Sequence, residues 1–213
     1  MTEGCINATI EIYQKIIEEK RPTPAKFHYL FNLRDISKVF QGILMSKPVS
    51  VPTPEVFAKL WIHESCRVFH DRLINSEDKV WFTKMVAELS NVYFRVRLEH
   101  DDLFVNSNLI FGDLLKLEST KAYEEIKDAV KLKTILTEYL DDYNITATSK
   151  MNLVFFEDAI QHISRVARVM RQPRGNMMLI GVGGSGKQSL TKLSCHMLAY
   201  TARQVEITKN FGS

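Results

Sequence analysis

The sequence predicts a mainly α fold that ends in a partial α/β unit. Apolar residues recur at helical spacing across most of the first 170 positions, as in packed amphipathic helices. Later, five mostly apolar residues at 176–180 run into a glycine-rich turn and then into helix-forming residues. Residues 204–207 alternate polar and apolar side chains, which is typical of a strand. Strand, loop, helix and strand in this order form the opening of a right-handed parallel unit.

Length and composition narrow the functional classes. The 213 residues, 45% of them apolar, can form one large domain or two smaller ones with real cores. No run of eighteen apolar residues and no secretion signal is present, so we expect an intracellular protein that does not bind a membrane. The net charge of +3 is too small to indicate a nucleic-acid partner. Cys5, Cys66 and Cys195 form no C-x-x-C pair, which favours reduced thiols over a zinc site or disulfide frame.

The first predicted helix, residues 6–20, is amphipathic and ends before the prolines that follow it. Its apolar face is expected to be buried and to consist of Ile6, Ile10, Tyr13 and Ile17.

The second predicted helix begins near residue 33, with Asn32 as its N-cap and Asp35 in its first turn. Arg34 lies in the same turn, where a cation opposes the helix dipole unless an anion or carboxylate is near. From the residues alone, a surface salt bridge is the more ordinary role for Arg34.

Further helices are predicted to begin at the N-cap Thr53, with Pro54 in the first position, and at Ser76. Within the first of them, His63 and Glu64 resemble the start of the zinc motif H-E-x-x-H, but Arg67 occupies its last position. No metal site is therefore predicted here, and the chain to about residue 95 is interpreted as a helical bundle.

The character of the sequence changes after residue 95, where charged and asparagine-rich stretches follow. We predict three segments: a helical domain at 1–95, a connecting helical segment at 96–150, and the beginning of a nucleotide-binding domain at 151–213. The last segment opens with an amphipathic helix that stops before Pro173. Phe156 and Ile160 are placed on its apolar face, and Arg168 is placed on the opposite face.

The glycine-rich turn carries the strongest functional signal. Gly181 to Lys187 fits the phosphate-loop pattern G-x-x-x-x-G-K between a strand and a helix. Its backbone N–H groups and the start of the following helix can bind phosphate oxygens, and the lysine adds a point charge. The expected ligand is ATP or ADP. The residues expected to bind it are Gly181, Val182, Gly183, Gly184, Ser185, Gly186, Lys187, Gln188 and Ser189.

One position departs from the pattern. The full motif has a serine or threonine hydroxyl after the lysine to hold Mg²⁺, whereas this sequence has Gln188 there and Ser189 one residue late. One residue is about 100° around a helix, so Ser189 should point away from the metal position. Mg²⁺ remains compatible with a bound nucleotide, but we assign no direct metal ligand and no catalytic residue. A glycine-rich turn without a ligand is the structural alternative.

Several stretches resemble one family. They are residues 27–42, 69–73 and 155–159, together with Arg171-Gln-Pro-Arg-Gly175 leading into Gly181-Val-Gly-Gly-Ser-Gly-Lys-Gln-Ser189. Together they resemble the motor region of dynein heavy chains, and the axonemal branch more than the cytoplasmic one. The resemblance covers nearly the whole chain. It implies that residues 1–95 form the helical lid of the third AAA+ module, and that the remainder opens the large domain of the fourth.

The resemblance also implies roles for individual residues. Arg34 falls at the position of the sensor-2 arginine, which reaches phosphates bound by the large domain of its own module. Leu153, Val154 and Phe155 match the segment that flanks the adenine, although a place in the apolar core explains them equally well. The fourth module is implied to bind nucleotide in a regulatory role.

The family further implies an ATP-driven, microtubule-directed motor in the cytoplasm and cytoskeleton, specifically in the axoneme of a cilium or flagellum. The implied partners are the rest of the heavy-chain ring in cis, and microtubules and other dynein chains through other regions. A P-loop ATPase also needs an acidic strand end for Mg²⁺ and water activation, and none is predicted here, so we expect no hydrolysis by this chain alone. Two alternatives stay open: a non-catalytic interaction module, and a truncated P-loop enzyme such as a kinase.

Overall fold

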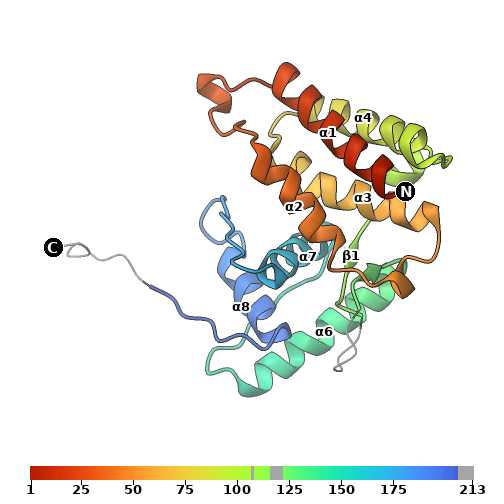
Figure 1. Ribbon diagram of the computed structural model, residues 1–213. Helices are drawn as coiled ribbons and strands as arrows, with labels where there is room; N and C mark the ends of the chain where they lie inside the picture. Colours follow the sequence, from red (N-terminus) through yellow and green to blue (C-terminus); the bar gives the residue numbers. More distant parts are fainter. Residues whose placement is uncertain (107, 116–121, 206–213) are drawn as a thin grey trace. The chain divides into compact units, whose positions relative to one another are not determined.

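The computed structural model describes residues 1–106, 108–115 and 122–205, and the chain forms two compact units, Met1–Asp128 and Ala129–Ser213 (Figure 1). None of the helices among the described residues combines the length and the hydropathy of a membrane-spanning segment.

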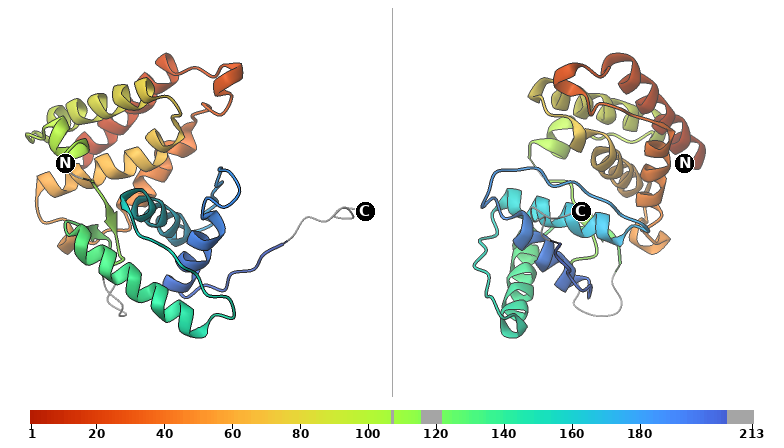
Figure 2. Two further views of the ribbon diagram at one scale, coloured as in Figure 1. Left: turned by 180° about the vertical axis from the view of Figure 1, so that it is seen from behind. Right: turned by 90° about the vertical axis from the view of Figure 1, so that its left-hand side faces the viewer.

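The first unit is a bundle of four long helices joined by segments that contain short 3₁₀ turns. The helices are α1 (Thr2–Glu19), α2 (Leu33–Ile43), α3 (Pro54–Val68) and α4 (Ser76–Phe94). Helix α4 packs against both α1 and α3, and α2 packs against α3 (Figures 1 and 2). The connecting segments contain the 3₁₀ turns η1 (Pro24–Lys26), η2 (Pro48–Ser50) and η3 (His70–Arg72), and the short helix α5 (His100–Phe104) follows the bundle.

The predicted helix starts at Asn32 and Thr53 are confirmed. The side chain of Asn32 accepts a hydrogen bond from the backbone of Arg34 at 2.9 Å, and Asp35 bonds back to the Asn32 amide at 3.0 Å. This pair is a capping box, which satisfies donors at the helix end that have no partner inside the helix. The hydroxyl of Thr53 accepts from the Val56 amide at 3.3 Å, with Pro54 in the first helical turn.

The centre of the bundle is Trp61, whose side chain is fully buried. Its indole Nε1 donates to the hydroxyl of Thr9 at 2.9 Å, and that hydroxyl donates to the Cys5 carbonyl at 2.7 Å. A buried indole keeps its hydrogen bond in this way, because an unpaired buried N–H is costly. The same ring packs against Phe94, with centroids 5.2 Å apart.

Of the predicted buried face of the first helix, Tyr13 is partly buried and packs against the core, but the three isoleucines are exposed. Ile6, Ile10 and Ile17 are 43%, 38% and 39% exposed, whereas the buried face of α1 includes Cys5, Ala8, Thr9, Ile12 and Ile16. Both sets follow helical spacing. Small residues on the buried stripe allow the backbone of α1 to lie close to the helices that pack against it. The spacing of apolar residues along the sequence does not reveal which stripe has these small side chains in contact with the bundle.

Residues after the bundle form a small hairpin that belongs to the first unit. Strands β1 (Phe111–Gly112) and β2 (Glu124–Glu125) are antiparallel, with Phe111 opposite Glu125. The hydroxyl of Tyr123 donates to the buried carboxylate of Glu64 in α3 at 2.6 Å. His63 lies next to Glu64, and its Nδ1 is 3.1 Å from the Leu109 carbonyl. The hairpin is therefore tied to α3 by buried polar contacts.

The two compact units do not coincide with the three predicted segments. Residues 96–128 belong to the first unit, and the second begins within the predicted connecting segment, at Ala129. The division into domains at 95 and 150 stays a prediction.

The second unit contains α6 (Ala129–Thr146), α7 (Glu157–Arg171) and α8 (Lys187–Met197), and α8 packs against both other helices. The side chain of Asn144 accepts from the Met151 amide at 2.8 Å and donates to its carbonyl at 2.9 Å, which folds the loop between them back on α6. His196, near the end of α8, lies 2.8 Å from a carboxylate oxygen of Asp142 in α6.

Two side chains of α7 differ from their predicted positions. Phe156 is the N-cap residue and is 61% exposed, whereas it was expected on the apolar face. Arg168 is buried, although it was expected on the solvent side. The buried side of α7 is therefore wider than the apolar stripe, and it includes the long aliphatic part of an arginine.

No strand is assigned at 176–180, where one was predicted, and within the described residues this segment pairs with no strand. Met178 and Ile180 are 79% and 87% exposed. A strand of a parallel sheet is stabilised by neighbours on both sides, and the described residues supply none for this segment. Of the second predicted strand, Gln204 and Val205 are in no strand, and 206–207 lie outside the described residues.

Candidate functional site

The glycine-rich turn is an open loop that ends directly in a helix. Gly184 and Gly186 have φ of 78° and 79°, a conformation that favours glycine, and Gly186 is the N-cap residue of α8. A Cβ atom added at Gly183, Gly184 or Gly186 would meet nothing within 4 Å. Glycine is thus required at 184 and 186 by the backbone conformation, and the space around the loop is open to a ligand.

Lys187 folds back over this loop. Its Nζ donates to the carbonyls of Gly181 and Val182 at 2.7 and 2.8 Å and to the hydroxyl of Ser185 at 3.0 Å. These bonds use all three donors of the ammonium group, and every acceptor is neutral. Among the residues that the structure describes, no carboxylate pairs with this charge, and a phosphate oxygen would be a stronger partner than any of the three.

The start of α8 supplies backbone donors. The amide of Leu190 donates to the Gly186 carbonyl at 2.9 Å and is the first to make the regular helical bond. The amides of Lys187, Gln188 and Ser189 precede it, so they are the donors that a helix N-terminus leaves without an intrahelical acceptor. Unpaired amides and the positive end of the helix dipole favour an anion at this place.

The residues of the loop fit phosphate better than they fit Mg²⁺. Gln188, at the hydroxyl position of the motif, is exposed, and Ser189 is half-buried. The loop from 181 to 189 contains no carboxylate, and no cluster of three His, Cys, Asp or Glu that could hold a metal occurs among the described residues. Hard divalent cations prefer oxygen ligands, carboxylates above all, and at the position where the motif supplies a hydroxyl this loop has an amide side chain.

A cavity of about 280 Å³ lies beside α8 within the second unit. Among the described residues, three cations and no carboxylate line this cavity, which favours an anionic ligand. Its lining residues are Leu179, Lys187, Gln188, Thr191, Lys192, Ala202, Arg203 and Gln204.

The segment expected to flank the adenine alternates between core and surface. Phe155 is buried, Leu153 is half-buried and Val154 is 76% exposed. The position of Phe155 agrees with the core alternative. Only the side chain of Val154 is fully available to a ligand.

Arg34 lies in the first unit, in the first turn of α2, and its side chain is exposed. The surface salt bridge expected as its ordinary role is absent, because within the described part of the chain its guanidinium contacts no acidic group. Sequence reasoning missed Arg72, which contacts the neighbouring Asp35. The two residues are 37 positions apart, and only the fold brings them together.

Two family models match the chain. Residues 151–213 match the P-loop containing dynein motor region D4, and residues 5–104 match the AAA+ lid domain. These matches confirm the predicted fold class, a helical lid followed by the opening of a P-loop domain.

Similar proteins point to the same family. Human dynein axonemal heavy chain 6 is 46% identical over 210 residues, which are 97% of this chain and 5% of the relative. Rat dynein axonemal heavy chain 1 is 46% identical over 220 residues, 100% of this chain and 5% of the relative. Mouse dynein axonemal heavy chain 3 is 43% identical over 217 residues, again 97% and 5%. The chain thus spans about a twentieth of the length of these relatives. It belongs to the axonemal dynein heavy-chain family, in which it corresponds to an AAA+ lid and the P-loop of motor region D4.

Proposed function

We propose that this chain contributes the phosphate-binding loop of one nucleotide site and the sensor-2 lid of another, within an ATP-driven, microtubule-directed motor of the ciliary or flagellar axoneme. The observation that supports the first part is the loop at 181–187: Lys187 lies over it, the helix that follows begins with amides that have no intrahelical acceptor, and space is open around Gly184 and Gly186. Arg34 supports the second part, because its exposed guanidinium has no acidic partner in the described chain.

The proposed ligand is ATP or ADP, bound through its phosphates. Lys187 would exchange its loop acceptors for phosphate oxygens, and the amides of Gln188 and Ser189 would donate to the same group. Because Gln188 stands where the motif has a hydroxyl, Mg²⁺ would be held by the phosphates and by groups outside this loop. The site would therefore respond to nucleotide in a regulatory role, and it would not drive rapid hydrolysis.

The motor context supplies the partners. The rest of the heavy-chain ring would cover this segment in cis, and microtubules and other dynein chains would bind elsewhere on the heavy chain. The proposed location is the cytoskeleton of a cilium or flagellum, as the names of the axonemal relatives suggest.

Titration of the chain with a fluorescent ATP analogue tests the loop. Lys187→Ala should weaken binding roughly 10- to 100-fold, because a hydrogen bond from a charged group contributes about 1.5–3 kcal/mol. Lys133→Ala is the matched control, since Lys133 is an exposed lysine of α6 in the same unit, and it should bind like the parent chain. Equal affinity of the Lys187 variant and the parent would refute the proposal.

One observation favours the alternative of a non-catalytic module without nucleotide. Lys187 is already satisfied by three acceptors of its own loop, so the turn is a stable arrangement without any ligand. Gly186→Ala separates the two functions, because it strains the loop and leaves the lysine in place. In a nucleotide site this variant should lose affinity, and in a ligand-free turn it should lower only the stability.

A further inference from the structure

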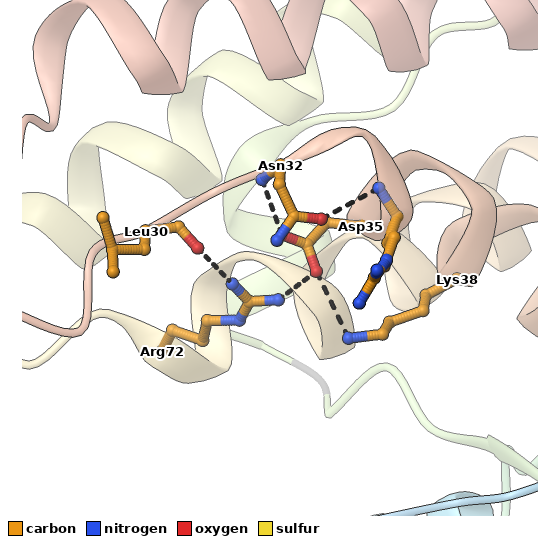
Figure 3. A network of polar contacts seen from close by, with 6 residues as sticks. Leu30, Asn32, Asp35, Lys38 and Arg72 are labelled. Atoms are coloured by element: carbon orange, nitrogen blue, oxygen red, sulfur yellow. Dashed lines mark hydrogen bonds and ion pairs between the residues drawn. The ribbon is translucent and has the colours of Figure 1, made fainter.

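The first turn of α2 contains a buried carboxylate whose two oxygens are both in use (Figure 3). Oδ2 of Asp35 accepts from the Asn32 amide at 3.0 Å and completes the helix cap. Oδ1 accepts from Arg72 and, at 3.3 Å, from Lys38. Burial alone would raise the pKa of Asp35, but the hydrogen bonds from Arg72 and from the Asn32 amide outweigh burial and lower it. The carboxylate is therefore charged at neutral pH and fully partnered.

Arg72 reaches this turn from η3 and contacts it at more than one place (Figure 3). One guanidinium nitrogen bonds to Asp35, and the other donates to the Leu30 carbonyl at 3.1 Å. The same group lies 5.2 Å from the ring centre of Phe31. Arg72 thus holds the chain on both sides of the N-cap Asn32, and it fixes the turn that carries Arg34.

The charges around Asp35 decide whether a phosphate that approaches Arg34 is attracted or repelled. Three cations belong to this region: Arg34 in the first turn of α2, and Lys38 and Arg72, which pair with the carboxylate of Asp35. Of these three cations, Lys38 and Arg72 pair with that carboxylate, and Arg34 does not. Without Arg72, a buried negative charge would remain beside Arg34 with one exposed lysine against it, and it would repel a phosphate.

We infer that Arg72 is a positioning residue for Arg34: it holds the first turn of α2 and cancels the charge of Asp35, so that the exposed guanidinium of Arg34 receives a phosphate. This inference rests on the proposed sensor-2 function of Arg34. It adds that the phosphate response of Arg34 depends on a residue that does not itself touch the phosphate.

The test follows the side-chain Nε–Hε resonance of Arg34 by NMR during titration with inorganic pyrophosphate. All variants carry Lys187→Ala, so that the loop of the second unit does not compete for the probe. Arg72→Gln should weaken the pyrophosphate response of Arg34 at least threefold. Arg97→Gln removes the charge of another exposed arginine of the same unit, and it should leave the response within about 1.5-fold of the parent.

A second variant separates charge cancellation from simple loss of structure. Asp35→Asn added to Arg72→Gln removes the uncompensated charge, and the asparagine oxygen can still accept from the Asn32 amide. This double variant should respond to pyrophosphate within about twofold of the parent, although it stays less stable to heat. If Arg72 were merely structural, the double variant would respond as weakly as Arg72→Gln.

The outcomes distinguish this inference from the function on which it rests. If Arg34 of the parent chain does not respond to pyrophosphate, the first turn of α2 binds no phosphate by itself, and the premise of the inference fails. If Arg34 responds and Arg72→Gln leaves the response unchanged, or if the double variant does not recover it, only the role of Arg72 is overturned.

Discussion

Asp78 joins three segments of the first unit, and its replacement by asparagine should destabilise that unit in a pH-dependent way. Its carboxylate accepts from Lys26 at 2.6 Å and from the Tyr29 hydroxyl at 3.0 Å, and it pairs with Lys20 at 3.1 Å. The Asp78 side chain is only 8% exposed. The carboxylate therefore ties the end of α1, the segment around η1 and the start of α4 together.

The expected size follows from these contacts. Hydrogen bonds to a charged group contribute about 1.5–3 kcal/mol, and an asparagine oxygen keeps part of this contribution. We expect Asp78→Asn to lower the free energy of unfolding of the first unit by about 2 kcal/mol at pH 7. Burial would raise the pKa of Asp78, but hydrogen bonds from Lys26, Lys20 and Tyr29 outweigh burial and lower it.

The direction of the pH effect follows from this lowered pKa. A carboxylate whose pKa is lower in the folded state stabilises the fold above its unfolded pKa of about 3.9, and this contribution is lost as the pH falls through the folded pKa. The parent and Asp78→Asn should therefore differ most at neutral pH and converge in strong acid.

Urea unfolding followed by tryptophan fluorescence measures this difference. Both tryptophans of the chain, Trp61 and Trp81, lie in the first unit, so the signal reports that unit alone. Glu77→Gln is the matched control, because Glu77 is an exposed acid in the same helical turn, and its effect should stay below about 1 kcal/mol. Equal free energies of unfolding for the parent and Asp78→Asn at pH 7 would refute the reasoning. A difference that stays the same in strong acid would refute it as well.

Three further predictions concern the loop, the hairpin and the unpaired segment. Gly184→Ala places a side chain on a residue with φ of 78°, which costs about 1–2 kcal/mol, and titration should show nucleotide binding weakened several-fold. Gly183→Ala is the control, because Gly183 has no positive φ and the substitution should have little effect on binding. Tyr123→Phe removes the donor to buried Glu64 and should destabilise the first unit by about 1.5–3 kcal/mol in urea; an unchanged midpoint would contradict this. Amides of 176–180 should show little protection in hydrogen exchange, because the described residues provide no strand to pair with them. Protection as strong as in α4 would contradict that expectation.

The local features of the fold could be predicted because their causes lie close together in the sequence. The cap of α2 depends on Asn32 and Asp35, three positions apart, and the start of α3 on Thr53 and Pro54. The loop at 181–187 was found for the same reason, since its glycines and lysine are contiguous. Such short-range chemistry needs no knowledge of the remaining chain.

The features that sequence reasoning missed depend on tertiary packing. Two neighbouring stripes of α1 both follow helical spacing, and the contacts of the bundle select the one that contains Ala8 and Ile12 over the one that contains Ile10. The bond between Asp35 and Arg72 crosses 37 positions, and no periodic pattern links them. The predicted strand at 176–180 followed from its residue types, whereas a β-strand also needs a neighbouring strand for its hydrogen bonds, and the described residues provide none.

Because Lys187 is hydrogen-bonded to its own loop, nucleotide binding at this loop replaces those hydrogen bonds with bonds to phosphate oxygens. The ammonium group gives up two carbonyls and a hydroxyl when it turns to a phosphate, so binding gains only the difference between the two sets of contacts. In return, the ligand-free loop holds the lysine next to the position that it would occupy against a phosphate. Ser185→Ala removes one of these resting contacts and so raises the energy of the vacant loop, but it also removes a hydroxyl expected to bind the nucleotide, and the change in affinity measures the difference between the two effects.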